Sequence, residues 1–401
     1  MKLLVLADIY PSKENPVLGV FVKEQVEQLK MYHDIRVMVI GRRFVRVGSR
    51  AFPKYMFSNL MGRIEGRKNK EDGQEIIRIE YPVFVINGRP LHIFNGISAY
   101  LAVFSKLNEM GFRPDLVYAH KSFPAGYAGW KIKSKTNVPV VTMEFQGPFS
   151  SYFDEPYLGD RVVSTINNVD RTVYIEFQLK EIMSCGVKRE RLGVAHYGID
   201  TDKFFLDREG VKRRKGETAR GRFKLLVVGR VEEKKGIRYL LEAIQILKKE
   251  FPHIHLSIAG PVDKGGEEIL DSIRKMRLED NIHYKGICPN SELPFVINAH
   301  DILVSASLFE TFGITLLEAM ACGKPVVATK SGGPAETVND KVGVLVEKAN
   351  PQALADGIRH VMENYEEYNQ EGIREYVVKN FSHEVAIKRL NELFEEVSRG
   401  K

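Results

Sequence analysis

A chain of 401 residues is too long for one ordinary hydrophobic core, so we expect two domains. Its 44% hydrophobic and 28% charged residues are typical of a soluble globular protein, and no apolar run is long enough for a membrane-spanning helix. The net charge of +7 is concentrated in two stretches, because 41–70 holds nine Lys/Arg against one Glu and 208–224 holds eight against two. The rest of the chain is net acidic, which indicates local anionic partners and excludes a generally basic protein.

The cysteines and the N-terminus indicate the compartment. Cys185, Cys288 and Cys322 are far apart and form no C-x-x-C pair, which favours a reducing compartment over disulfides or structural zinc. The apolar run that begins at Leu3 ends at Asp8, too soon for a signal peptide. We therefore expect a cytoplasmic protein that begins with a buried strand.

The first half opens with a strand, a loop, a helix and a second strand. The strand is 3–7, and the loop that follows is rich in turn residues and ends near Gly19. Apolar residues at helical spacing come next, and a strand follows at 35–40. Two further strands are predicted at 114–118 and 138–142.

The second half repeats this order. A strand at 224–229 leads into the loop 230–236, a helix with apolar residues from 237 to 247, and a strand at 255–259. Both halves therefore begin with a β-loop-α-β unit of Rossmann type. Neither loop has the G-x-G-x-x-G spacing, so a dinucleotide cofactor is not supported. Later strands are predicted at 282–284, 301–304 and 325–328.

Strands that alternate with helices predict an α/β fold with two parallel sheets covered on both faces. We expect two Rossmann-like domains that face a central cleft, where the strand ends of each sheet form a ligand site. The predicted boundaries are 1–207 for the first domain and 224–380 for the second. The basic stretch 208–223 lacks apolar periodicity and is expected to be a linker or a surface excursion, and 381–401 is expected to form a C-terminal helix.

The stretch "SLFETFGITLLEAMACGKP" places Glu310 and Glu318 around a helix start. Gly313 permits a tight turn before the helix, and the free backbone N–H groups from Gly313 to Thr315 favour phosphate. Two carboxylates on either side of such a site could accept hydrogen bonds from the hydroxyls of one extended ligand. The alternative is a solvated helix face, since helices carry many surface glutamates.

Several motifs in a fixed order carry a resemblance to a known family. They are "SLFETFGITLLEAMACGKPVVATKSGGPAETV" followed by "GVLV", "VVGRVEEKKG" at 227–236, "KGI" at 285–287 and "YGIDTDKF" at 197–204. In these motifs the chain resembles the family-four retaining glycosyltransferases, or group 1 glycosyl transferases. The resemblance covers the C-terminal half well and the N-terminal half more loosely. It implies a GT-B fold whose C-terminal helix crosses back to the N-terminal domain.

The resemblance also implies roles for single residues. Arg230 and Lys235 would bind the donor diphosphate, Glu318 the ribose hydroxyls, and Glu310 the transferred sugar near its reacting face. His120 would lie near the donor sugar and orient a hydroxyl or assist proton movement. Backbone contacts would come from Gly19, Gly313, Ile314 and Thr315 at the diphosphate and from Gly286 and Ile287 near the nucleobase. The alternatives are solvated cations, an ordinary turn glycine and a structural histidine.

Two departures from the family pattern concern the first half. The family often has a T-x-H-G segment where this chain has Thr142 to Pro148 with Glu144, and Tyr197 replaces the usual Asn before "GID". Both changes are expected on the acceptor side, so the sequence leaves the acceptor open: a glycan, a lipid or a small metabolite. It also leaves open a UDP-linked or a GDP-linked donor, and the oligomeric state.

The resemblance implies transfer with retention at the anomeric carbon. A retaining glycosidase would use two carboxyls about 5–5.5 Å apart, and no convincing pair of that type is present. We therefore favour front-face substitution, in which the leaving diphosphate accepts the proton of the acceptor hydroxyl. No D-x-D-like metal motif stands out, and we expect no metal and no cofactor, with Arg230 and Lys235 supplying the positive charge. A sugar-nucleotide epimerase and a non-catalytic nucleotide-sugar-binding protein are the alternatives.

The basic stretch 41–70 interleaves its cations with Phe44, Phe52, Tyr55 and Phe57. This pattern predicts peripheral contact with an anionic membrane, because many members of the resembled family act on lipid-linked acceptors. Nucleic acid is not expected as a partner. The alternative is a solvated loop with a few residues anchored in the core.

Overall fold

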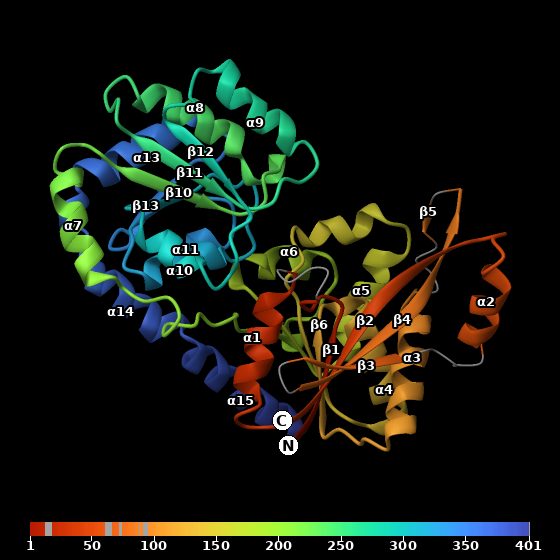
Figure 1. Cartoon of the computed structure of the whole chain (residues 1–401). Helices are drawn as coiled ribbons and strands as arrows, with labels where there is room; N and C mark the ends of the chain where they lie inside the picture. The colour runs from red at the N-terminus through yellow and green to blue at the C-terminus, as the bar shows by residue number, and fades with distance from the viewer. Residues whose placement is uncertain (13–17, 61–65, 72–73, 88, 91–94, 401) are drawn as a thin grey trace. The chain divides into compact units, whose positions relative to one another are not determined.

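The computed structural model describes residues 1–401 except 13–17, 61–65, 72–73, 88, 91–94 and 401. Within elements, the side chains of 42, 57–60, 66–71, 74–75, 81, 89–90 and 95–99 are likewise not described. The chain forms two compact units (Figure 1). Unit 1 comprises Met1–Tyr197 and Ala386–Lys401, and unit 2 comprises Gly198–Val385.

Unit 1 is built on one sheet whose described strands have the order β3-β4-β2-β1-β6-β7-β8-β9, with β5 against β4. The strands are β1 (Lys2–Ala7), β2 (Asp34–Arg46), β3 (Gly66–Glu71), β4 (Gln74–Ile86), β5 (Arg89–Pro90), β6 (Leu116–His120), β7 (Val140–Met143), β8 (Arg171–Tyr174) and β9 (Leu192–Val194). The helices are α1 (Val20–Leu29), α2 (Phe52–Leu60), α3 (Asn95–Met110), α4 (Tyr127–Thr136), α5 (Leu158–Asn168), α6 (Leu179–Ser184) and the greater part of α15 (His383–Ser398).

The central strands of unit 1 are parallel and buried on both faces. Val5 of β1 lies opposite Val37 of β2 on one side and Tyr118 of β6 on the other. Burial on both faces explains why these strands are continuous apolar runs. The prediction of parallel sheets is therefore confirmed for the centre, but β3 and β5 pair with β4 in antiparallel fashion at one edge.

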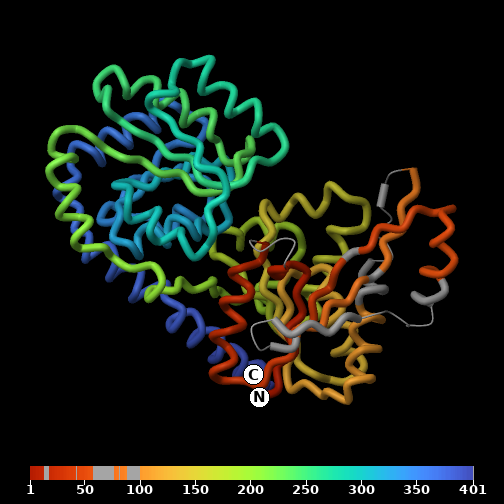
Figure 2. The backbone as a smooth tube through the Cα atoms, viewed as in Figure 1, coloured from red at the N-terminus to blue at the C-terminus, as the bar shows by residue number. Residues whose placement is uncertain are grey.

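Helix α15 completes the core of unit 1. Phe394 packs with its ring 5.1 Å from that of Tyr118, and Arg171 on β8 forms an ion pair of 2.8 Å with Glu396. Ile387 and Leu390 belong to the same buried cluster as the residues of β1. The C-terminal end of the chain therefore lies beside the N-terminal strand in unit 1 (Figure 2).

Unit 2 is built on a sheet of parallel strands in the order β12-β11-β10-β13-β14-β15. Helices α8, α9 and α13 lie over one face, and α10 and α11 over the other (Figure 1). The strands are β10 (Lys224–Val228), β11 (His255–Ala259), β12 (Ile282–Gly286), β13 (Ile302–Ser305), β14 (Val326–Thr329) and β15 (Gly343–Val346). The helices are α7 (Arg208–Thr218), α8 (Ile237–Leu247), α9 (Gly266–Lys275), α10 (Leu293–Asn298), α11 (Ile314–Ala321), α12 (Pro334–Thr337), α13 (Pro351–Glu363) and α14 (Gln370–Phe381).

The basic stretch after Asp207, expected to be a linker or a surface excursion, forms helix α7 of unit 2. The Asp207 carboxylate caps α7 by accepting a hydrogen bond of 2.9 Å from the backbone N–H of Gly210. Arg214 reaches the fully buried Asp301 with a bidentate contact of 2.6 and 3.0 Å. One arginine thus anchors a helix that lacks an apolar stripe, so hydrophobic periodicity could not predict it.

Much of the basic stretch 41–70 belongs to regular elements as well. Strand β2 continues to Arg46, six residues beyond the predicted end at Ile40, and helix α2 follows. Residues 61–65 and the side chain of Phe57 lie outside the described part. No helix within the described residues is both long and apolar enough to span a bilayer.

Candidate functional site

The candidate site of unit 2 lies where the strand order of its sheet reverses. Strand β10 pairs with β11 on one side and with β13 on the other, so the loops that follow β10 and β13 leave the sheet as neighbours. Ligands of open parallel sheets bind at such a switch point, beyond the carboxyl ends of the strands. The two loops, 229–236 and 306–313, contain Arg230, Lys235, Glu310 and Gly313 of the residues that the resemblance singles out.

Two close backbone contacts hold these loops together. Gly236 has a φ of 63°, and a Cβ atom added there would lie 2.0 Å from the carbonyl oxygen of Ala306. The backbone N–H of Leu308 donates a hydrogen bond of 2.9 Å to the carbonyl oxygen of Lys234. Only glycine fits at position 236, because a side chain would collide with the second loop as well as strain the backbone.

This contact places Lys235 against Glu310. The Lys235 Nζ lies 2.6 Å from a carboxylate oxygen of Glu310, and the two side chains are 25% and 17% exposed. Arg230 flanks the pair and forms ion pairs of 2.9 Å with Asp263 and 3.0 Å with Glu232. Lys235, Glu310 and Arg230 line one recess together with Thr315. The structure thus brings together four of the residues predicted to bind the donor.

Cations and carboxylates are paired at the recess: Arg230 and Lys235 line it with Glu310, and Glu232 and Asp263 pair with Arg230 beside it. Lys234 is a further cation beside Lys235, with its Nζ 5.0 Å from the ring centre of Phe309. Burial and then the charge of Lys235 lower the pKa of Lys234. A backbone N–H from Lys264 and then the guanidinium of Arg230 lower the pKa of Asp263, which therefore stays ionised. Sequence reasoning missed Lys234 and Asp263, although Lys234 is visible beside Lys235 in "VEEKKG".

The start of α11 supplies donors to the same recess. Gly313 precedes the helix with φ 81° and ψ 48°, a left-handed conformation that suits glycine. The first backbone N–H groups of a helix have no acceptor within it, so those near Ile314 and Thr315 can bind an anion. Glu318 follows one turn later on α11 and is buried, and it is not among the described residues that line this recess.

The carboxyl edge of the sheet continues from β10 to the predicted nucleobase residues. A Cβ atom on Gly260, which follows β11, would lie 1.9 Å from the carbonyl oxygen of Gly229. The N–H of Gly260 donates a hydrogen bond of 2.8 Å to the carbonyl of Gly286 at the end of β12. Ile287 follows with 63% of its side chain exposed. The ends of β10, β11 and β12 thus form a continuous backbone edge from the recess to the exposed Ile287.

His120 belongs to unit 1 and is fully buried. It is the last residue of β6, its Nδ1 lies 3.0 Å from the Tyr197 hydroxyl, and its ring centre is 4.6 Å from that of Tyr118. Its Nε2 has no hydrogen-bond partner among the described residues. Burial lowers the pKa of His120 to about 3, so the imidazole is neutral at physiological pH.

The switch point of unit 1 also carries an ion pair that sequence reasoning missed. Asp8 follows β1 and Lys121 follows β6, and their charged atoms lie 3.3 Å apart. Strand β1 separates β2 from β6, so this pair has the same topological position as the recess of unit 2. Lys121 has φ 75°, an uncommon conformation for a residue with a side chain. Gly19 lies at the start of α1, and a Cβ atom there would be 2.8 Å from the backbone of Ile9 and Tyr10.

The two departures from the family pattern lie near each other. The ring of Tyr197 is 6.1 Å from that of Phe145, which follows Glu144. The buried carboxylate of Glu144 accepts hydrogen bonds of 2.9 Å from the N–H of Ser122 and 3.1 Å from the Tyr152 hydroxyl. Glu144 therefore ties the loops after β6 and β7 together and has its acceptor capacity satisfied inside the protein.

The described residues include no group of three or more His, Cys, Asp or Glu side chains that could hold a metal ion. The residues predicted to bind the donor divide between the units. Arg230, Lys235, Glu310 and Thr315 line one recess, with Gly313 and Ile314 at its helix start, and Gly286 and Ile287 lie two strands away on the same sheet edge. Gly19 and His120 belong to unit 1.

Comparisons with known proteins agree with the two-unit architecture. Residues 21–203 match Glycosyltransferase Family 4, and residues 209–377 match Glycosyl transferases group 1. A D-inositol 3-phosphate glycosyltransferase of Paenarthrobacter aurescens (strain TC1) is 27% identical over 65% of this chain and 67% of its own length. An uncharacterized glycosyltransferase of Methanocaldococcus jannaschii is 26% identical over 80% of this chain and 87% of its own length.

Solved structures show the same fold. Sucrose-phosphate synthase from Thermosynechococcus elongatus superimposes with a TM-score of 0.76 at 16% identity over 100% of both chains. Anabaena HepE, in complex with UDP and glucose, superimposes with a TM-score of 0.72 at 19% identity, over 99% of this chain and 100% of HepE.

Proposed function

Because the chain belongs to the GT-B glycosyltransferases, we propose that it transfers a sugar, with retention of configuration, from a nucleoside-diphosphate sugar to an acceptor hydroxyl. The observation that carries this proposal is the pairing of Lys235 with Glu310 beside Arg230 and the start of α11. One small recess then offers cations and helix N–H groups for a diphosphate and a carboxylate for sugar hydroxyls. HepE, of similar fold, was solved with UDP-glucose, which makes a UDP-linked sugar the first donor to test and a GDP-linked sugar the second.

The proposed step needs little covalent chemistry from the protein. The acceptor oxygen forms a bond to the anomeric carbon on the face from which the diphosphate leaves, and the bond from that carbon to the phosphate oxygen breaks. The electron pair of the broken bond stays on the diphosphate, which also takes the proton of the acceptor hydroxyl. Arg230, Lys235 and the N–H groups at the start of α11 stabilise the charge that builds on the diphosphate.

Donor binding has to change the Lys235–Glu310 contact. In the structure these two charges neutralise each other at 2.6 Å. A diphosphate would compete for Lys235, and the freed carboxylate of Glu310 could accept hydrogen bonds from the sugar. Glu318, one turn along α11, is proposed to receive the ribose hydroxyls.

We propose that the reaction is independent of metal ions, because the cations of the recess can supply the charge that a bound metal would provide. Chelation with EDTA should leave turnover unchanged. A loss of turnover that Mg²⁺ or Mn²⁺ restores would overturn this part of the proposal.

Product analysis tests the function as a whole. The full-length chain is incubated with UDP-glucose or GDP-mannose and a lipid or glycan extract, and released nucleoside diphosphate and glycosylated product are measured by mass spectrometry. Transfer supports the proposal. A donor sugar that is epimerised without use of an acceptor would indicate an epimerase, and donor binding without turnover would indicate a binding protein.

The acceptor side is proposed to include an anionic membrane. The segment 43–56 with Ile86 of β4 forms a surface, here called the tip, that combines exposed apolar and cationic side chains. Phe44 is 62% exposed, and Arg43 lies over the ring of Tyr55 at 5.1 Å. Apolar side chains that enter the interface and cations that meet lipid phosphates together favour such a surface. Its other exposed members are Arg46, Val47, Arg50, Lys54 and Met56.

Cosedimentation with vesicles of anionic lipid tests the tip. Binding should be present at low salt and weaker at high salt, and Phe44→Ser should reduce it several-fold. Phe295→Ser is the matched control, because Phe295 is 64% exposed on α10 of unit 2. No binding at low salt, or equal loss in both variants, would remove the membrane from the proposal.

A further inference from the structure

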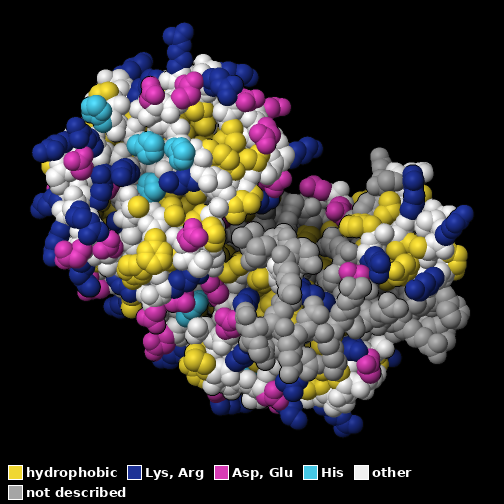
Figure 3. Space-filling view, in the orientation of Figure 1, with side chains coloured by type: hydrophobic (Ala, Val, Ile, Leu, Met, Phe, Trp, Pro, Cys, Tyr) yellow, Lys and Arg dark blue, Asp and Glu magenta, His cyan; other side chains and the backbone are white. Residues whose placement is uncertain are grey.

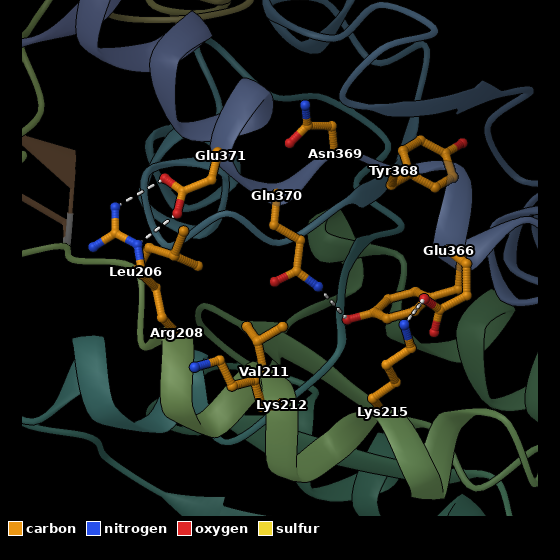
Figure 4. Close-up of a pocket in the computed structure, with 11 residues that line it drawn as sticks. Leu206, Arg208, Val211, Lys212, Lys215, Glu366, Tyr368, Asn369, Gln370 and Glu371 are labelled. Carbon is orange, nitrogen blue, oxygen red and sulfur yellow. Dashed lines mark hydrogen bonds and ion pairs between the residues drawn. The ribbon is translucent and has the colours of Figure 1, made fainter.

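Unit 2 contains a second recess, here called the α7–α14 slot, which encloses about 440 Å³ between helix α7 and the segment that leads into α14 (Figure 4). Its floor consists of Leu206, Val211, Tyr365 and Gln370. One rim carries cations from α7, and the opposite rim carries Glu366 and Glu371. None of these residues lines the recess with Lys235 and Glu310, so the slot is a separate site.

The cations of the slot share one face of α7. Arg208, Lys212 and Lys215 follow helical spacing, and Figure 4 shows them on the side of α7 that meets Glu371 and Glu366. Arg208 closes one end with a bidentate contact of 2.6 and 3.0 Å to Glu371, and Lys215 closes the other with an ion pair of 3.4 Å to Glu366. Lys212 lies between them and pairs with Glu209 of its own helix. The middle of the slot therefore keeps a cation that is not bridged to the opposite rim.

The floor carries a polar atom that lacks a partner. The amide nitrogen of Gln370 donates a hydrogen bond of 3.3 Å to the Tyr365 hydroxyl. The amide oxygen of Gln370 is buried, and within the described part of the chain it accepts no hydrogen bond. If the amide is turned over, its NH₂ group takes that position, so one end of the amide is unsatisfied in either orientation. An unsatisfied buried polar group is costly, and a hydroxyl group of a ligand would satisfy it.

We propose that the slot binds a phosphorylated sugar or polyol. The phosphate would meet Lys212 between Arg208 and Lys215, and hydroxyls would pair with the Gln370 amide. The carbon face of the ring would cover Leu206 and Val211. A purely apolar ligand would leave the Gln370 amide unsatisfied and make no use of Lys212, and inorganic phosphate alone would leave the apolar floor exposed.

The slot is connected to the donor recess through one helix. Gly323 directly follows the C-terminal cap of α11, and a Cβ atom there would lie 2.7 Å from Leu206 Cδ1 and 2.9 Å from the carbonyl oxygen of Gln370. Arg374 of α14 donates a hydrogen bond of 2.6 Å to the carbonyl of Ala321, the last residue of α11. The other end of α11 is the helix start proposed to bind the diphosphate. A ligand that shifts Leu206 or Gln370 therefore acts on a short rigid element that ends in the donor site, so we infer that slot occupancy changes donor affinity. This coupling rests on the proposed function.

Calorimetric titration of the full chain with glucose 6-phosphate tests the site. Glucose and inorganic phosphate should each bind at least about tenfold more weakly than glucose 6-phosphate, because each uses only part of the slot. Lys212→Gln should weaken glucose 6-phosphate binding about tenfold. Arg213→Gln is the matched control with the same charge change on the neighbouring residue, which does not line the slot, and should leave binding unchanged. Equal affinity for inorganic phosphate, equal effects of the two variants, or no binding at all would overturn the site.

Titration with UDP, with and without saturating glucose 6-phosphate, tests the coupling. We expect the affinity for UDP to change about fivefold or more, and Gln370→Leu to abolish that change while the fold remains intact by circular dichroism. An unchanged UDP affinity with the slot occupied would overturn the coupling. If UDP does not bind under any condition, the proposed donor fails, whereas the glucose 6-phosphate titration still decides whether the slot is a binding site.

Discussion

The switch points of the two sheets have the same topology but different surroundings. In unit 2 the loops after β10 and β13 present Arg230, Lys235 and Glu310 to a recess, where 54%, 25% and 17% of their side chains are exposed. In unit 1 the residues after β6 and β7 are enclosed, because His120 and Glu144 are buried and find partners among neighbouring tyrosines and backbone N–H groups. In unit 2 the charged groups pair with one another at an open recess, where a charged ligand could compete for them, whereas unit 1 uses its buried polar groups to fix its own loops.

The two units also differ in the side chains that their surfaces expose. The space-filling view shows Lys and Arg side chains spread over the visible face of unit 2, and yellow apolar side chains beside cations on part of unit 1 (Figure 3). The tip around Phe44 exposes apolar residues next to arginines.

The largest effect is expected from removing the charges of the donor recess. Lys235→Ala should lower turnover about 10²- to 10³-fold, because a preorganised charge at a developing anion is worth that much. Glu310→Ala should lower turnover more than it lowers nucleotide affinity. Steady-state kinetics with the identified donor measures both effects. Lys330→Ala is the control, because Lys330 forms an exposed ion pair of 2.7 Å with Glu347 and should leave the kinetics unchanged. Normal kinetics in both Lys235→Ala and Glu310→Ala would overturn the site assignment.

A smaller effect is expected from the glycine that joins the two loops. Gly236→Ala should destabilise the protein by about 2–4 kcal/mol, because its Cβ would meet the Ala306 carbonyl at 2.0 Å and its backbone is left-handed. Gly286→Ala is the matched control, because its φ of 75° is similar but a Cβ atom there meets nothing within 4 Å. It should cost only about 1 kcal/mol. If urea unfolding shows the same loss of unfolding free energy in Gly236→Ala and Gly286→Ala, the contact between the loops does not contribute to stability.

The smallest effect concerns His120 and depends on pH. Its pKa of about 3 in the folded chain lies below the ordinary 6.5, so the unfolded state binds a proton first as the pH falls. His120 therefore costs no stability above pH 6.5 and destabilises the fold progressively from pH 6.5 towards 3. His120→Asn should be less stable than wild type at pH 7, and the gap should narrow by about 2 kcal/mol at pH 5. If the difference in unfolding free energy between wild type and His120→Asn is the same at pH 7 and pH 5, the pKa of His120 is not lowered by burial and the imidazole is open to solvent.

Apolar runs predicted the central strands of both sheets because those strands are buried on both faces. They did not predict β8, β9 and β15, or helix α7, which lacks an apolar stripe and pairs with Asp301 through Arg214. In the site, two separate motifs indicated Lys235 and Glu310 as residues that bind the donor. Their contact follows only from the pairing of β10 with β13, which no local pattern shows. The partnership of His120 with Tyr197 joins residues 77 positions apart, so it too was out of reach of local patterns.

The central claim is that the nucleoside diphosphate of the donor binds to the recess of unit 2. Calorimetric titration of UDP and GDP into the wild-type chain, Lys235→Ala and His120→Asn tests it most directly. We predict that one nucleotide binds the wild type, that Lys235→Ala binds it at least about tenfold more weakly, and that His120→Asn binds it with unchanged affinity. Equal affinity in wild type and Lys235→Ala, or a loss of binding confined to His120→Asn, would contradict the claim.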